Sequence, residues 1–210
     1  MQINLTFEKD IFRILLISDT HIYRTGQHLP VFVMNAFQEN SPDLILHCGD
    51  ICTMDFIDEL QKIAPVYAVR GNRDLLNWFR LPDMIDLNIN GFRIHMEHGQ
   101  GGLFSYLAVK TEFTLLKLLG KQPDYSRAVR FKDNYREFDL YCVGHSHSRF
   151  MTKKDRTILI NPGHMNFENP EKEHEAPSFA LIEVGKESLR INVMIIENEN
   201  IRRDSASFSR

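Results

Sequence analysis

The sequence lacks any apolar run long enough to cross a membrane, and it contains few cysteines. Three of the 210 residues are cysteines, which is an odd number, and all three lie in or beside apolar segments. They predict reduced, half-buried thiols rather than a disulfide framework. The first residues include acidic side chains and lack the apolar core of a signal peptide. We therefore expect a cytoplasmic protein with no membrane partner.

The chain also lacks a large excess of charge of either sign. Its formal net charge is −3 at pH 7, which argues against binding to long nucleic acid or to an anionic membrane. A local cationic or metal-centred phosphate site remains compatible with this charge. The composition, 43% hydrophobic and 25% charged, is ordinary for a globular domain with a large core.

Apolar segments separated by turn residues predict an alternation of strands and helices. Nearly continuous apolar runs, typical of strands buried on both faces, predict strands at 12–18, 43–50 and 66–69. Helical spacing lies between them, at 31–40 and 54–63. The order β-α-β-α-β indicates an α/β fold with a parallel or mixed sheet. Further strands are predicted at 91–99, 139–150, 156–164, 176–184 and 188–196, and further helices at 101–122 and 126–138.

The length fits one domain. We expect this domain to span residues 1–196, with a helical insertion at 100–138. The segment 197–210 is polar and is expected to be a loosely held C-terminal tail.

Imidazole, carboxylate and carboxamide side chains follow five of the predicted buried strands. They are Asp19, His21, Asp50, Asn72, His98, His145 and His147. Each motif alone is also typical of an ordinary turn or cap. In an open α/β sheet, however, the carboxyl ends of strands form the ligand site, so the set can converge on one place. Mixed histidine and aspartate ligands favour a pair of Mn, Fe or Zn ions over Mg or Ca.

The motifs SDTH, CGD, GNRD, HG and GHSH, in this order, resemble the calcineurin-like metallophosphoesterases. The resemblance covers roughly residues 12–184. The short chain and Asn161-Pro162-Gly163 make it more similar to the small bacterial and archaeal phosphodiesterase branch, which also includes the retromer subunit Vps29. The resemblance implies an α/β fold of the four-layer αββα sandwich type with a dinuclear metal centre. Mn is the expected cofactor metal, with Fe, Ni or Zn as alternatives.

The resemblance also implies the roles of individual residues. One metal would take Asp19, His21, Asp50 and His147, and the other would take Asp50, Asn72, His98 and His145, with Asp50 as the bridge. The expected reaction is hydrolysis of a small phosphodiester by in-line attack of a hydroxide held between the metals. Asp50, Asn72, Arg73 and His98 are the expected catalytic residues. The alternatives are a phosphomonoesterase, a nuclease, or a non-catalytic binding scaffold like Vps29.

Arg73 departs from the family pattern, in which a histidine occupies this position of the GNHD motif. Arginine does not give up a proton at neutral pH, so a general acid is missing here, which favours diesters with good leaving groups. Two interpretations of Arg73 remain: it binds a phosphate oxygen, or it points into solvent. Asp74 either orients the ligands or caps the following turn. From unperturbed histidines we expect metal binding and activity to fall as the pH drops through roughly 6–7.

The long insertion admits several interpretations. The segment 101–122 could form a lid, line a pocket, mediate a homo-oligomer or pack in the core. Cys48 and Cys52 have the spacing of a weak metal clip. His95 is expected on the face opposite His98, in a structural role, whereas His164 lies either at the metal rim or in a turn.

Overall fold

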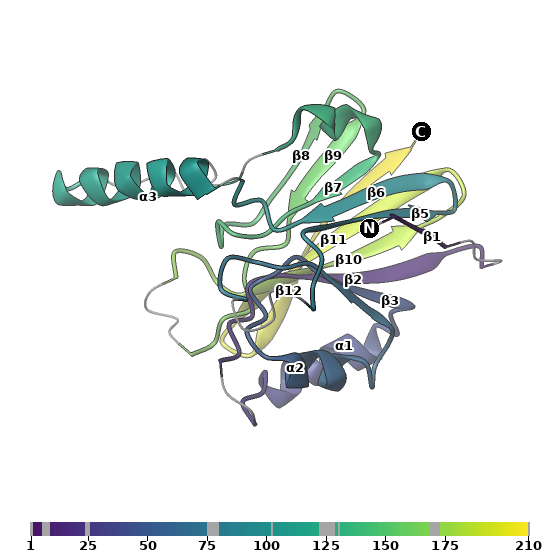
Figure 1. The fold of residues 1–210 in the computed structure, drawn as a ribbon. Coiled ribbons are helices and arrows are strands. Elements are labelled where there is room, and N and C mark those ends of the chain that lie inside the picture. The colour runs from purple at the N-terminus through teal and green to yellow at the C-terminus, as the bar shows by residue number, and fades with distance from the viewer. Residues whose placement is uncertain are drawn as a thin grey trace.

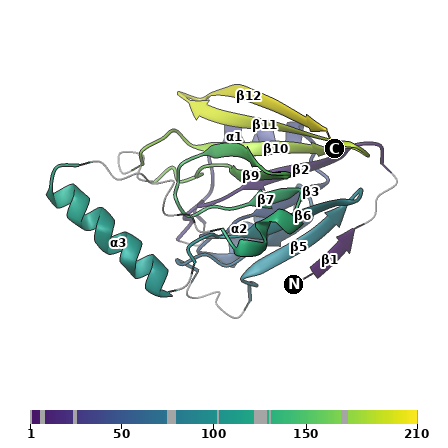
Figure 2. The ribbon, with the colours of Figure 1, turned by 90° about the horizontal axis from the view of Figure 1, so that it is seen from above.

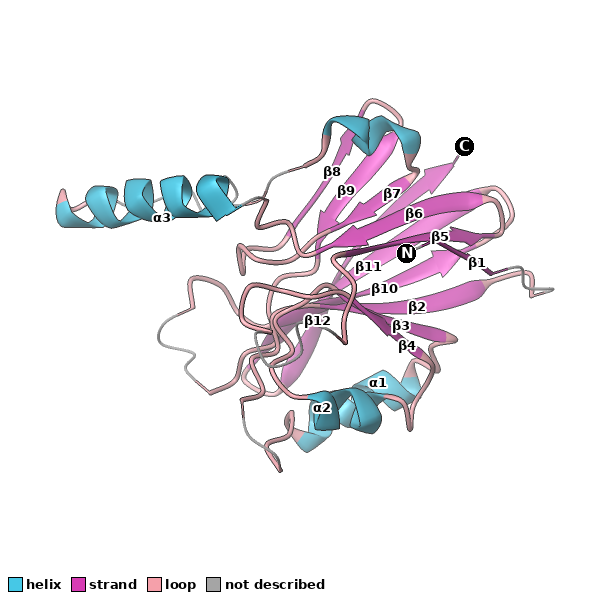
Figure 3. Cartoon of the chain, viewed as in Figure 1, coloured by secondary structure: helices cyan, strands magenta, loops and turns pink. Residues whose placement is uncertain are grey.

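The computed structural model describes residues 2–5, 9–23, 26–74, 80–101, 103–121, 129, 131–168 and 173–209. Two six-stranded sheets face each other across a common core (Figures 1 and 3). The first sheet has the order β1 (Gln2–Leu5), β5 (Met84–Ile89), β6 (Phe92–Glu97), β7 (Leu140–Cys142), β9 (Thr157–Asn161), β8 (Phe150–Lys154). The second sheet has the order β12 (Asn200–Ser209), β11 (Ser188–Glu197), β10 (Ser178–Val184), β2 (Phe12–Ile17), β3 (Leu44–His47), β4 (Val66–Ala68).

The position of β2 between two cores explains why its segment is almost entirely apolar. Ile14 and Leu16 face the core between the sheets, whereas Leu15 and Ile17 pack in a second core that includes residues of two helices. These helices, α1 (Val31–Glu39) and α2 (Met54–Leu60), cover the outer face of the second sheet (Figure 1). Strands β2, β3 and β4 are parallel, which confirms the predicted β-α-β-α-β unit.

The outer face of the first sheet is covered by a thinner layer. A small cluster around Tyr135, Phe138 and Tyr141 packs there, and it includes residues of the 3-10 helix η3 (Asp133–Glu137). The α/β sandwich of two sheets is therefore confirmed, but the helix predicted at 126–138 is wrong over its described part. Tyr135 and Phe138 are both buried and lie three residues apart, a spacing that the three-residue turn of a 3-10 helix places on one side. Residues 126–128 and 130 lie outside the described residues.

Helix α3 (Leu103–Leu118) confirms the helix expected within 101–122. It extends away from both sheets, as the two perpendicular views show (Figures 1 and 2). Its described side chains are exposed or half-buried, and Leu115 and Leu118 are 57% and 80% exposed. Core packing is therefore the wrong interpretation for these side chains, while the lid, pocket and homo-oligomer interpretations stay predictions. None of the helices in the described ranges is long and apolar enough to span a membrane.

The end of the chain is a strand and not a loosely held tail. Strand β12 pairs antiparallel with β11 from Asn200 to Ser209, so the prediction for 197–210 is wrong over this range. Its half-buried side chains, Ile201, Ala206 and Phe208, alternate with exposed polar residues only in part. The preceding strands β10 and β11 form an antiparallel hairpin around Gly185.

Candidate metal centre

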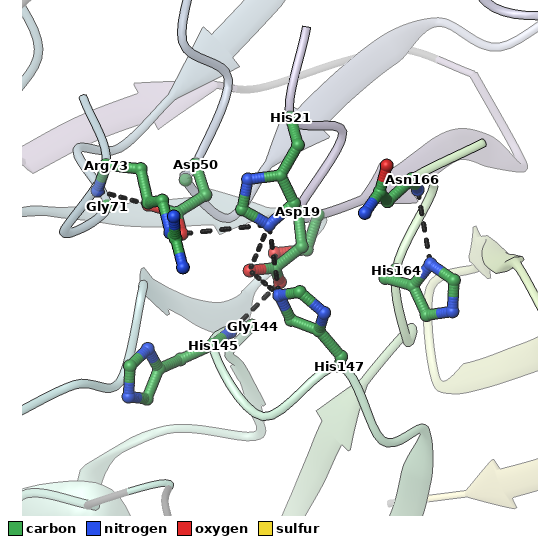
Figure 4. Close-up of polar contacts among 12 residues, drawn as sticks. Asp19, His21, Asp50, Gly71, Arg73, Gly144, His145, His147, His164 and Asn166 are labelled. Carbon is green, nitrogen blue, oxygen red and sulfur yellow. Dashed lines mark hydrogen bonds and ion pairs between the residues drawn. The ribbon is translucent and has the colours of Figure 1, made fainter. Parts of the chain in front are cut away.

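Strands of both sheets deliver polar side chains to one place. The second sheet contributes Asp19 and His21 after β2, Asp50 after β3 and Asn72 after β4, and the first sheet contributes His98 after β6 and His145 and His147 after β7. All seven residues predicted as metal ligands meet there, because the carboxyl ends of these strands lie at the same end of the sandwich. Figure 4 shows Asp19, His21 and His147 pointing toward one another.

Five of these residues have a left-handed backbone conformation. The φ angles are 51°, 51°, 57°, 70° and 57° for Asp19, His21, Asp50, His145 and His147. Such a conformation costs a non-glycine residue about 1–3 kcal/mol, although aspartate and histidine adopt it more readily than branched residues. The centre therefore stores backbone strain that the surrounding contacts must hold in place.

The glycines of the GN and GH motifs allow the loops to approach each other closely. A Cβ atom on Gly71 would lie 2.1 Å from Oδ1 of Asp50, and a Cβ on Gly144 would lie 1.9 Å from Oγ of Ser18. No side chain fits at such distances. The glycines are thus part of what brings the ligand side chains together.

A first cluster consists of Asp19, His21 and His147. Oδ1 of Asp19 lies 3.4 Å from Nε2 of His147 and 3.9 Å from Nε2 of His21. The two Nε2 atoms are 3.0 Å apart. Ligand atoms about 2.1 Å from one shared ion lie roughly 3–4 Å from each other. The spacing of the cluster therefore fits a metal ion.

A second cluster contains Asp19, Asp50 and His98. Nε2 of His98 lies 3.5 Å from Oδ1 of Asp50 and 3.1 Å from Oδ1 of Asn72. The same oxygen of Asn72 is 2.9 Å from Nδ1 of His145. The side-chain oxygen of Asn72 thus lies within 3.1 Å of both histidines, as expected for a ligand of a second ion.

Asp19 carries the most direct sign of a cation-binding site. Its Oδ2 atom accepts hydrogen bonds from Oγ of Ser18 at 2.6 Å and from the backbone nitrogen of His145 at 3.0 Å. Its Oδ1 atom is buried and finds no hydrogen-bond partner in the described part of the chain. A buried anionic oxygen without a donor is unfavourable, and a cation between Oδ1 and the nearby imidazoles offsets this penalty. The residues present therefore fit a metal centre.

Two of the histidines are oriented by contacts on the side away from the centre. Nδ1 of His98 lies 2.7 Å from the carbonyl oxygen of Cys48, and Nδ1 of His147 lies 2.6 Å from Oε2 of Glu173. Because each of these oxygens accepts a hydrogen bond from Nδ1, Nδ1 carries a proton in both histidines. Nε2 is then the nitrogen that faces the centre. The sequence did not indicate this contact of Glu173 with His147, because Glu173 lies in a polar segment without a pattern.

The carboxylates of the centre favour positive charge on these imidazoles. Burial would lower the pKa of His147, but Asp19 and Glu173 outweigh burial and raise it to about 10. For His98, burial is likewise outweighed by Asp50 and Asp19, which raise the pKa to about 9. The site is thus electrostatically prepared for cations, whether protons or metal ions.

Asp74 holds the two loops of the second sheet together. Its fully buried carboxylate accepts hydrogen bonds from the backbone nitrogens of Asp50 (2.9 Å), Ile51 (2.9 Å), Cys52 (2.7 Å) and Gly71 (2.8 Å). Since these donors belong to the loops after β3 and β4, Asp74 fixes the position of Asp50. The interpretation of Asp74 as an orienting residue is confirmed.

Arg73 lies at the exposed rim of the centre. Its backbone nitrogen donates to Oδ1 of Asp50 at 2.7 Å (Figure 4). Burial raises the pKa of Tyr23 to about 12, and the nearby Arg73 side chain partly opposes this shift. The hydroxyl of Tyr23 lies 3.0 Å from Nδ1 of His21. The guanidinium is therefore near the rim of the centre, and Tyr23 is a further rim residue that the sequence did not indicate.

Two other histidines lie outside the ligand set. Nδ1 of His95 is 2.5 Å from Oδ1 of Asp86 on the outer face of the first sheet, as expected for a structural role. His164 accepts a hydrogen bond from the backbone nitrogen of Asn166 at Nδ1 and donates from Nε2 to the carbonyl of Glu175 at 2.9 Å. His164 packs near the rim, but both of its ring nitrogens are engaged.

The cysteine thiols take no part in the centre. All three are free, as predicted, but they are buried and not half-buried. Within the described ranges, the groups of side chains close enough to hold a metal ion include no cysteine. The metal clip of Cys48 and Cys52 is therefore wrong.

Comparison with known proteins identifies related sequences. The sequence profile of the calcineurin-like phosphoesterase superfamily domain matches residues 12–187. A probable metallophosphoesterase of Methanocaldococcus jannaschii is 34% identical over 148 residues, which are 70% of this chain but only 65% of that relative, less than two thirds of its length. A probable metallophosphoesterase of Methanothermobacter thermautotrophicus is 30% identical over 148 residues, 70% of this chain and 74% of that protein.

Solved structures share the fold. Vacuolar protein sorting 29 from Cryptosporidium parvum matches with a TM-score of 0.71 and 19% identity, over 96% of this chain and 100% of that one. A conserved protein of Streptococcus pneumoniae matches with a TM-score of 0.59 and 16% identity, over 95% of this chain and 98% of that one. At this level of identity the likeness concerns the fold alone.

Proposed function

Because the chain belongs to the calcineurin-like phosphoesterase superfamily, we propose that it is a metal-dependent phosphodiesterase with a dinuclear centre. The observation that carries the proposal is the buried Oδ1 atom of Asp19, which lacks a hydrogen-bond partner among the described residues and lies 3.4–4.0 Å from Nε2 of three histidines. Mn²⁺ is the proposed metal, with Fe, Ni or Zn as alternatives, since mixed imidazole and carboxylate ligands suit these ions.

The proposed ligand sets extend the two clusters, in which Asp19 is the shared residue, with Asn72 and His145. Asp19, His21, Asp50 and His147 would hold one ion, and Asp50, Asn72, His98 and His145 would hold the other. Asp50 is proposed as the bridge because its two oxygens face different clusters. Oδ2 lies 3.9 Å from Nε2 of His21, and Oδ1 lies 3.5 Å from Nε2 of His98.

Two bound cations would supply a nucleophile at neutral pH and offset the charge that develops during in-line displacement at phosphorus. The chain's own residues would orient the metal ligands and bind the substrate. Glu173 and the carbonyl of Cys48 keep Nε2 of their histidines turned toward the centre. Arg73, exposed at the rim, is proposed to hold a non-bridging phosphate oxygen through its planar fork of donors.

The proposed substrate is a small phosphodiester with a good leaving group. Arg73 stands where a general acid would protonate the departing oxygen, and arginine does not release a proton at neutral pH. Substrates that need no such proton are therefore favoured. The net charge of −3 disfavours a long polyanion, which leaves a small diester as the preferred substrate class.

Hydrolysis of bis-p-nitrophenyl phosphate and of p-nitrophenyl phosphate, each with added Mn²⁺, tests the proposal. We expect the diester to be hydrolysed faster and the Asp50→Asn variant to be inactive. Asp58→Asn makes the same chemical change at an exposed site on α2 and is expected to retain activity. Faster hydrolysis of the monoester would point to a phosphomonoesterase, and no turnover of either ester by the metal-loaded protein would leave a binding scaffold.

A further inference from the structure

A second pocket lies at the end of the sandwich opposite the metal centre. Its lining includes Arg93 at the start of β6, Asp139 just before β7 and Arg156 just before β9. Strands β6 and β7 run from this pocket to His98 and His145 at their other ends, so the sheet separates the two sites. In Figure 1 the turn between β5 and β6 lies on the right, whereas α3, which follows His98, projects on the left.

The pocket has the volume and the walls of a small-molecule site. It is an open hollow of about 490 Å³, within the roughly 300–1,000 Å³ typical of ligand pockets. Both sheets contribute apolar side chains to it: Phe92 and Ile158 from the first, and Leu189 and Phe208 from the second. Phe208 is half-buried, and the other three are buried. Phe208, which packs against this core, therefore offers the accessible apolar surface that a flat group can contact at this edge of the sandwich.

Three cations from separate segments line the same pocket: Arg93, Lys153 and Arg156. Asp139 is the acid among the lining residues, and its Oδ1 atom lies 3.7 Å from the guanidinium of Arg156. Its Oδ2 atom accepts the backbone nitrogen of Arg93 at 2.8 Å. In the part of the chain that the structure describes, no carboxylate forms an ion pair with the side chains of Arg93 or Lys153. The pocket thus gathers a net positive charge in a chain whose net charge is −3.

We propose that this pocket binds a nucleotide, a ligand that combines a phosphate with a flat aromatic base. Guanidinium groups bind phosphate through paired charge-assisted hydrogen bonds, and Lys153 adds a third positive charge. The ring of Phe208, on the opposite sheet, offers a surface against which a base can stack. The site does not depend on the metal centre, because no proposed metal ligand lines it.

Calorimetric titration of the full chain with adenosine monophosphate, adenosine and inorganic phosphate, all with a chelator present, tests this proposal. The chelator removes metal-dependent binding, so the outcome is independent of the proposed hydrolysis. We expect the monophosphate to bind more tightly than adenosine or phosphate alone. Arg93→Gln and Lys153→Gln are each expected to weaken it about tenfold. Phe208→Ala should weaken binding of the monophosphate but not of inorganic phosphate.

Matched controls separate this site from the rest of the surface. Arg190→Gln removes an exposed arginine of β11 that pairs with Glu183 and does not line the pocket, so it should leave binding unchanged. Arg93→Gln should also keep the wild-type response to Mn²⁺ and to the diester substrate. The proposal is overturned if adenosine monophosphate binds no better than inorganic phosphate, or if Arg93→Gln and Lys153→Gln bind it as well as Arg190→Gln does.

Discussion

Replacing Asp74 with asparagine tests whether one buried carboxylate holds the metal-binding loops in place. Each oxygen of Asp74 accepts two backbone donors: Oδ1 binds Ile51 and Cys52, and Oδ2 binds Asp50 and Gly71. Asparagine has the same shape but only one acceptor oxygen. In either orientation of the amide, two buried N–H groups lose their acceptor and face the NH₂ group instead.

The size of the effect follows from this count. A buried donor without an acceptor costs about 1–3 kcal/mol, so two of them lower the free energy of unfolding by about 2–6 kcal/mol. We expect urea unfolding of Asp74→Asn, measured with a chelator present, to show a loss in this range. The Mn²⁺ affinity should fall as well, because Asp74 positions the backbone of Asp50.

Asp58→Asn is the matched control, since Asp58 is exposed on α2, and it should change the free energy of unfolding by less than about 0.5 kcal/mol. A loss below about 1 kcal/mol for Asp74→Asn would refute the reasoning, because the four donors would then be satisfied without the carboxylate.

Two further predictions concern the centre itself. With pKa values raised to about 10 and 9, His147 and His98 are protonated in the metal-free chain at pH 7.5, so metal binding should release about two protons. Titration calorimetry in buffers of different ionisation enthalpy measures this number, and release of fewer than one proton would contradict it. The stability that these raised pKa values give the metal-free chain is present below about pH 6.5 and is lost as the pH rises through about 9–10. The pH range in which metal affinity falls therefore lies above the range of roughly pH 6–7 that is expected from unperturbed histidines. Gly144→Ala should weaken Mn²⁺ binding and destabilise the chain by about 1–3 kcal/mol, because its Cβ would lie 1.9 Å from Oγ of Ser18. Adding Ser18→Ala should restore part of the loss, and no rescue would show that the clash lies elsewhere.

The metal ligands could be predicted because each follows a segment with a clear local pattern. The apolar run before Asp19 is buried on both faces, and such a run ends where the polar residues begin. The sequence also contained the glycines beside Asp50, Asn72 and His145. The division of these strands between two facing sheets could not be predicted, because it depends on long-range strand pairing and not on local periodicity.

Other features had no local signal. Strand β12 is polar over most of its length, because it lies at the edge of its sheet with mostly exposed side chains. The strand β5 and the edge strands β1 and β8 were missed as well. Glu173 reaches His147 from a polar segment whose composition resembles any surface loop. In each case the partner that gives the residue its role lies far away in the sequence.

The position of the centre between the two sheets has a consequence for how the chain persists in a cell. Asp19 and Asp50 come from one sheet, and His98 and His147 come from the other, so each of the two proposed ions would have ligands from both sheets and would act as a cross-link between the halves of the fold. A ligand that binds only the folded chain at a hundred times its dissociation constant adds about 2.7 kcal/mol to stability. Exposure to proteases would then follow the free metal supply, so that metal starvation would shorten the lifetime of the protein and not only silence it.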